Sequence, residues 1–134
     1  MKRYVAEARS ADVARSVSQA RYTSTSLVSR AEVSAVLAKA VRTGALSERA
    51  AKTCLDSFRL DWPALIRVEL NESIVAQADS FAWEHGLRGY DAVHLASAWV
   101  WQDAMGGPVT VATFDKQLWS AAKAQGLSTI PATL

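Results

Sequence analysis

Three acidic residues are placed where their carboxylates could act together. Glu32 follows a stretch at residues 21–28 that is rich in β-branched and aromatic side chains. Asp115 likewise follows a β-branched stretch at residues 109–113. Acids at strand-to-helix turns lie at one edge of a parallel sheet, beyond the strand ends where ligands bind in such folds. Asp91 opens a long apolar helix and can reach the same edge from the side.

Carboxylates that converge repel one another and raise one another's pKa unless a cation lies between them. A divalent cation removes this conflict, and ligand sets made of oxygen alone favour magnesium or manganese over zinc. Glu32, Asp91 and Asp115 are therefore the predicted metal ligands, and Mg²⁺ or Mn²⁺ is the predicted ion. We expect their carboxyl groups to lie within roughly 8 Å of one another.

Each acid also has a purely structural interpretation. Asp91 suits the N-cap of its helix, and Glu32 suits a capping box of the form Ser29-x-x-Glu32. His94 lies one helical turn after Asp91, but an isolated histidine on an apolar helix is more often packed than bound to a transition metal. On this interpretation the acids would stabilise helix ends and bind nothing.

The elements that carry these acids alternate between helices and strands. Helices are predicted at residues 4–20 in two short pieces, from Ser29 to Gly44, at 47–60, from Asn71 to Gly86, from Asp91 to the loop at 106–108, and from Asp115 to Gly126. Strands are predicted at residues 21–28, 65–70, 109–113 and 128–130. The run at 109–113 is typical of a strand buried on both faces. The predicted class is α/β, with a parallel sheet wrapped by helices.

Composition narrows the class of protein further. Half of the 134 residues are hydrophobic, which suits one compact domain over residues 1–134. No segment is apolar enough for a membrane span or a secretory signal, so we expect a cytoplasmic protein without a membrane partner. A net charge of +2, carried mainly by arginine, permits a nucleic-acid partner. The sequence contains no glycine-rich phosphate loop, Cys-x-x-Cys pair or serine elbow.

Taken together, these motifs resemble the PIN-domain nucleases and, within them, the VapC-type toxins of bacterial type II toxin–antitoxin pairs. The resemblance covers the whole chain and rests on SRAEV at 29–33, GYDAVHLASA at 89–98, and VATFDKQL at 111–118 with the helix that follows. It implies a magnesium-dependent endoribonuclease that hydrolyses RNA phosphodiesters. It also implies a VapB-type antitoxin as a partner, and a homodimer.

The family's metal site uses four acids, and Glu32, Asp91 and Asp115 match three of them. In the family a short buried strand ending in Asp-x-Ser or Asp-x-Thr precedes the first helix, whose middle resembles residues 1–7 here. The resemblance therefore implies a chain whose start is placed late and whose first, central strand is absent. Asp12 is no substitute for the fourth acid, because it lies beyond that helix.

The absent strand would leave the strands at 21–28 and 109–113 each with an unpaired edge. Buried backbone groups without partners cost about 1–3 kcal/mol each. We expect one of three outcomes: the two strands pair directly, another chain supplies the missing strand, or the protein is marginally stable and prone to aggregation.

Two other functions compete with an active nuclease. One is a catalytically silent PIN-like protein that binds an antitoxin without cleaving RNA. The other is a receiver-like regulatory domain, which is disfavoured because its acids would cluster after the first strand. Arg30, Arg88 and Lys116 lie near the proposed site in the sequence and could contact phosphates, although exposed helix positions explain them equally well.

Overall fold

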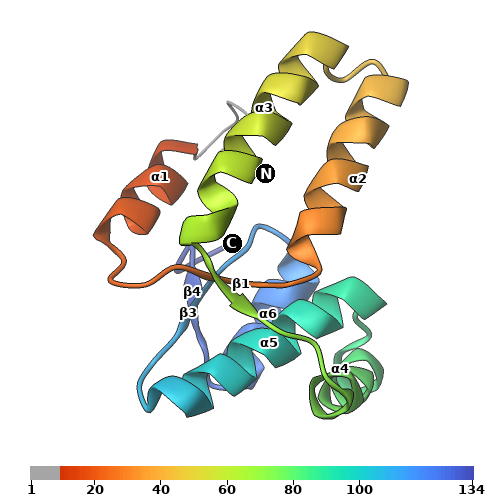
Figure 1. The fold of residues 1–134 in the computed structure, drawn as a ribbon. Helices are drawn as coiled ribbons and strands as arrows, with labels where there is room; N and C mark the ends of the chain where they lie inside the picture. The colour runs from red at the N-terminus through yellow and green to blue at the C-terminus, as the bar shows by residue number, and fades with distance from the viewer. Residues whose placement is uncertain (1–9) are drawn as a thin grey trace. The chain divides into compact units, whose positions relative to one another are not determined.

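The computed structural model describes residues 10–134, in which helices alternate with short strands (Figure 1). In chain order the elements are α1 (Ser10–Gln19), β1 (Ser24–Ser26), α2 (Ser29–Arg42), α3 (Glu48–Asp61), the 3₁₀ helix η1 (Trp62–Ala64), β2 (Ile66–Val68), α4 (Glu72–His85), α5 (Gly89–Met105), β3 (Thr110–Ala112), α6 (Lys116–Ala124) and β4 (Ser128–Ile130). The predicted α/β class is confirmed. No helix of the described part is long and apolar enough to cross a membrane.

The predicted elements agree with the structure in kind; of the described strands, β1, β2 and β3 are shorter than predicted, and β4 has the predicted bounds. Each strand has three residues, so the predicted strand at 21–28 contracts to β1. The second of the two short helices predicted at 4–20 is α1, and the first lies outside the described residues. Helix boundaries agree more closely because capping residues mark them locally: Ser47, Asn71 and Asp115 each accept a backbone N–H at a helix start.

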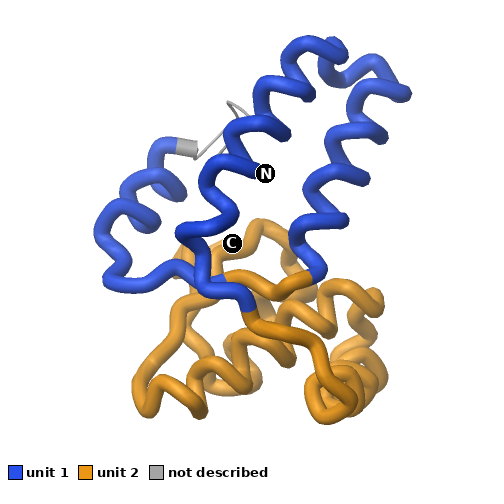
Figure 2. Tube along the Cα trace, viewed as in Figure 1, with its two compact units in different colours: residues 1–24, 28–67 blue, residues 25–27, 68–134 orange. Residues whose placement is uncertain are grey.

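The chain forms two compact units, coloured separately in Figure 2. Unit 1 comprises residues 1–24 and 28–67, and unit 2 comprises residues 25–27 and 68–134. The division passes through β1 and β2, which pair as a two-stranded sheet. The candidate residues are therefore distributed over two units, with Glu32 in the first and both aspartates in the second.

Unit 1 is built on the helical hairpin of α2 and α3. Leu37, Ala51, Phe58 and Trp62 are its buried apolar residues. The rings of Phe58 and Trp62 lie 5.4 Å apart between centroids. The Arg67 guanidinium donates to the Trp62 carbonyl oxygen at 3.1 Å and lies over the Trp62 ring. The end of α3 is thus held against the start of β2.

Unit 2 contains the larger core, which gathers α4, α5 and α6 (Figure 1). Its buried members are Ile74, Ala78, Phe81, Leu87, Ala92, Leu95, Ala96, Leu118, Ala121, Ala122 and Leu127. Alanines where α4, α5 and α6 meet allow close packing of their backbones, and Leu95 at 0 % exposure fills the centre. This core fixes α5 and α6, the two helices that carry Asp91 and Asp115 at their starts.

The strands of the described residues form two separate pairs, β1 with β2 and β3 with β4. The second pair is parallel, with Thr110 opposite Ser128 and Ala112 opposite Ile130. The expected direct pairing of the strands at 21–28 and 109–113 is therefore not seen in residues 10–134. The other two outcomes, a strand from a second chain and marginal stability, stay predictions.

The prediction that the strand at 109–113 is buried on both faces is wrong. Thr110 and Ala112 are exposed, whereas Val109 and Val111 are half-buried and pack against the core of unit 2. Successive side chains of a strand point to opposite faces, and in unit 2 only one face of β3 meets the helices. The β-branched residues at 109–113 therefore indicate that this segment favours a strand, and they do not indicate that both faces of the strand are buried.

Two glycines near the start of α5 offer a matched test of backbone conformation. Gly86 ends α4 in the left-handed region at φ 63°, whereas Gly89 is the first residue of α5. A Cβ at either position meets nothing within 4 Å, so steric contact does not distinguish the two sites. Gly86→Ala should lower the free energy of unfolding by about 1–2 kcal/mol because of its positive φ.

Gly89→Ala should instead be neutral or stabilise the chain by up to about 1 kcal/mol, because alanine restricts the unfolded chain more than glycine does. Urea denaturation followed by circular dichroism measures both variants. Equal losses of stability in the two would contradict this explanation.

Candidate active site

The turn between β3 and α6 holds Asp115 at a defined position. Asp115 is the N-cap of α6, and its Oδ1 accepts the backbone N–H of Leu118 at 2.9 Å. The backbone N–H of Asp115 donates in turn to the Thr113 hydroxyl at 3.2 Å. Thr113 donates its own backbone N–H to the carbonyl of Ile130, the last residue of β4. Because Oδ1 serves the cap, Oδ2 is the oxygen that remains for a ligand.

Asp91 lies in the first turn of α5 but is not its N-cap. The helix begins at Gly89, and Arg88 in extended conformation is the cap residue, without a side-chain cap hydrogen bond. The prediction that Asp91 opens the helix as a cap is therefore wrong by three residues, because an apolar pattern locates a helix better than it locates the helix's first residue. Asp91 retains a favourable interaction with the helix dipole, and its side chain is 27 % exposed. These two features explain why a charged Asp91 is compatible with this position even though it does not cap the helix.

One arginine interacts with both aspartates. Arg88 Nε lies 3.5 Å from Asp91 Oδ2, and Arg88 Nη2 lies 3.8 Å from Asp115 Oδ2. The two carboxylates come from different helices and approach different nitrogens of the same guanidinium. Unit 2 thus brings together two of the three predicted site residues, around a positive charge.

Glu32 lies in the first turn of α2, in unit 1. The helix begins at Ser29 itself, and Val28 is the N-cap residue without a side-chain cap hydrogen bond. The predicted capping box with Ser29 as the N-cap is therefore wrong by one residue, and Ser29 is instead buried. Glu32 consequently lies on the first helical turn, one position later than the box requires.

Within residues 10–134, no group of three or more histidine, cysteine, aspartate or glutamate side chains is arranged to hold a metal ion. Asp91 and Asp115 share the guanidinium of Arg88, whereas Glu32 belongs to the other unit. The convergence of all three carboxylates stays a prediction.

The other basic residues near these acids in the sequence differ in their surroundings. Arg30 lies over the ring of Trp62 at 5.8 Å from the centroid, within unit 1. Lys116 follows Asp115 directly and is exposed at the start of α6. Arg88 is the most exposed of the groups at the acidic pair, with 81 % of its side chain accessible.

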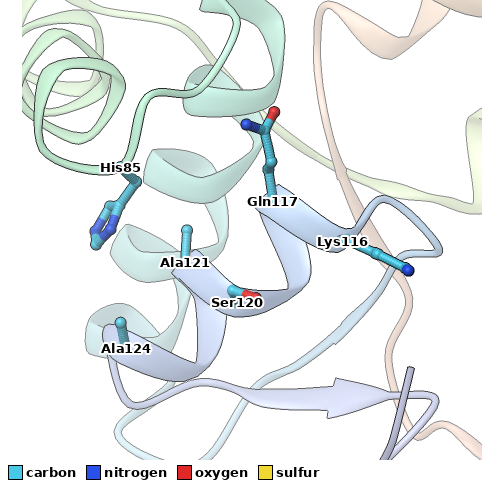
Figure 3. Close-up of a pocket in the computed structure, with 6 residues that line it drawn as sticks. All are labelled: His85, Lys116, Gln117, Ser120, Ala121 and Ala124. Carbon is cyan, nitrogen blue, oxygen red and sulfur yellow. The ribbon is translucent and has the colours of Figure 1, made fainter.

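A hollow of about 440 Å³ lies beside α6 in unit 2 (Figure 3). It is lined by His85, Lys116, Gln117, Ser120, Ala121 and Ala124. Figure 3 shows His85 facing α6 from the end of α4, and it shows the Lys116 side chain pointing away from His85. The His85 Nε2 atom lies 3.0 Å from the Gln125 amide nitrogen, a hydrogen bond between α4 and the end of α6. Among residues 10–134 no carboxylate lines this hollow, and none of the three predicted metal ligands belongs to its lining.

The sequence predicted Arg88 as a possible phosphate contact. Its ion pairs with Asp91 and Asp115 were not predicted. The available signal was its position three residues before Asp91, a spacing at which side chains meet on a helix. No local signal pointed to the interaction with Asp115, which depends on how α5 and α6 pack.

The order of helices and short strands is consistent with the fold of one protein family. The sequence matches the PIN domain family over residues 5–124, and the chain belongs to this family. Among its relatives are ribonuclease VapC45 and ribonuclease VapC49, from two strains of Mycobacterium tuberculosis. Each is 39 % identical to this chain over 104 residues, which cover 77 % of this chain and 69 % of the relative.

Proposed function

We propose that this chain is a metal-dependent endoribonuclease that hydrolyses RNA phosphodiesters, and that it is the toxin of a toxin–antitoxin pair. Membership of the PIN domain family and two relatives named as ribonucleases support RNA as the substrate. The observation that carries the proposal is the pair Asp91 and Asp115, whose Oδ2 atoms approach one cationic group from two helices.

The donor atoms suit a divalent cation. PIN nucleases generally use such ions, and carboxylate oxygens are the ligands that magnesium and manganese prefer. Both aspartates are partly exposed, at 27 % and 37 %, so their oxygens are accessible from solvent. Mg²⁺ is the proposed ion, with Mn²⁺ as an alternative.

The acidic and the basic residues of the proposed site have different tasks. Asp91 and Asp115 would hold the ion, and Glu32 is the proposed third ligand. When bound, a divalent cation makes a water molecule more acidic and offsets negative charge that develops on the phosphodiester. Arg88 and Lys116 would contact phosphates of the RNA, since exposed cationic side chains supply much of nucleic-acid affinity.

The proposal extends to the protein's partners and setting. A VapB-type antitoxin would neutralise the toxin, which would act in the cytoplasm as a homodimer. The family match includes residues of both units, which supports the proposal that residues 1–134 work as a single PIN-like domain.

Cleavage of a structured RNA by the purified full chain tests the proposed reaction. We expect cleavage in Mg²⁺ or Mn²⁺, loss of cleavage in EDTA, and recovery when excess Mg²⁺ is added. The physical reason is that clustered carboxylates contribute little to phosphodiester hydrolysis without the cation they bind. Cleavage that persists undiminished in EDTA would contradict metal dependence.

The same assay addresses the catalytically silent alternative. A chain that is folded by circular dichroism, binds its antitoxin and leaves RNA intact in both metals would be a binding protein and not a nuclease. Calcium provides a further control, because it binds oxygen ligands with looser geometry than magnesium does.

A further inference from the structure

Arg88 lies beside the same carboxylate oxygens that the proposed metal ion would need. Its side chain leaves the backbone directly before α5, where the extended conformation of the cap residue directs the chain into the helix. Nε faces Asp91 at 3.5 Å and Nη2 faces Asp115 at 3.8 Å, in both cases at the Oδ2 atom. A cation bound by these two aspartates would need the same oxygens.

These ion pairs are suited to being broken. Charge-assisted hydrogen bonds between nitrogen and carboxylate usually measure about 2.7–2.9 Å, and both distances here are longer. The Arg88 side chain is 81 % exposed, so water and salt screen its attraction to the acids. A divalent cation carries twice the charge and would repel the guanidinium as it bound.

We propose that Arg88 occupies the charge site between Asp91 and Asp115 until a divalent cation displaces it. This inference rests on the proposed metal site. Arg88 balances two carboxylates that would otherwise repel each other, and it therefore competes with the cation for them.

The backbone already places both carboxylates, so competition is the main effect of Arg88 on metal binding. Asp115 Oδ1 accepts the Leu118 N–H, and Asp91 lies in the first turn of α5. Once displaced, the exposed guanidinium stays beside the site because its backbone precedes α5 directly. Its planar fork then suits a phosphate oxygen pair of the RNA.

Manganese binding provides the direct test, because Mn²⁺ is followed by electron paramagnetic resonance without any RNA. Arg88→Gln should bind Mn²⁺ about threefold to tenfold more tightly than the parent chain, since two weak ion pairs no longer compete. The same variant should cleave RNA more slowly at saturating metal, because a phosphate contact is lost. Tighter metal binding together with slower cleavage is not expected from a purely structural role.

Two variants serve as controls. Lys116→Gln removes one positive charge next to Asp115, and no ion pair of Lys116 with either aspartate occurs in the described part of the chain. It should change manganese affinity less than Arg88→Gln does. Arg88→Lys retains the charge but not the fork that spans both carboxylates, so its affinity should lie between the parent and Arg88→Gln.

The outcomes separate this inference from the proposed function. Saturable manganese binding that is equal in parent, Arg88→Gln and Lys116→Gln overturns the competition and leaves the metal site standing. Equal gains in Lys116→Gln and Arg88→Gln also overturn it, because general charge would then explain the change. Failure of both the parent and Arg88→Gln to bind manganese overturns the metal site and the competition together.

Discussion

Replacing Asp115 by asparagine should reduce metal-dependent RNA cleavage by at least about 100-fold, since even residues that only support metal ligands contribute factors of about 10–100. Asparagine caps a helix about as well as aspartate does, so α6 should keep its hydrogen bond to the Leu118 N–H. The change therefore removes the charge at Oδ2 and preserves the cap. Initial rates of cleavage at saturating Mg²⁺ measure the effect, and Asp91→Asn should show a loss of the same order.

The control for this prediction is Asp79→Asn, which removes an exposed acid of unit 2 from α4. It alters the net charge equally and should leave cleavage unchanged. Asp115→Ala adds the loss of the cap, which should cost about 0.5–2 kcal/mol of stability besides the activity. If Asp115→Asn cleaves RNA as fast as the parent, Asp115 is only a helix cap and the proposed metal site loses a ligand.

Truncation of Leu95 to alanine should lower the free energy of unfolding by about 2–5 kcal/mol, because it combines lost burial with a cavity in the core. Leu95 is 0 % exposed at the centre of unit 2, where α4, α5 and α6 pack together. A loss of this size is a large fraction of the 5–15 kcal/mol that is typical of a domain. Urea denaturation followed by tryptophan fluorescence measures it, and Trp101 is a buried reporter on the same helix.

The matched control is Leu60→Ala, the same chemical change at a leucine that is 82 % exposed. Surface substitutions of this kind usually change stability by no more than about 0.5 kcal/mol. Similar losses in the two variants would show that the core of unit 2 is not organised around Leu95. Because α5 also carries Asp91, Leu95→Ala should weaken manganese binding as α5 loosens.

The sequence by itself determined the helices, their order and the position of Asp115 at the start of α6. Apolar residues recur at helical spacing within α2 and α4, and Gly86 and Gly106 end helices in the left-handed conformation. Asp115 was placed correctly at the start of its helix, because a cap interacts only with residues a few positions ahead. Local motifs also predicted the PIN domain family, and the family match over residues 5–124 confirms it.

Only the tertiary structure decided how the strands pair and which charges meet. Strand length and burial depend on partners distant in the sequence, so the run at 109–113 contracted to β3 with one face against the helices. Arg88 meets Asp115 because the packing of α5 on α6 brings together residues with 26 positions between them. Local sequence preferences do not predict that ion pair, because it forms only when the helices of unit 2 pack together.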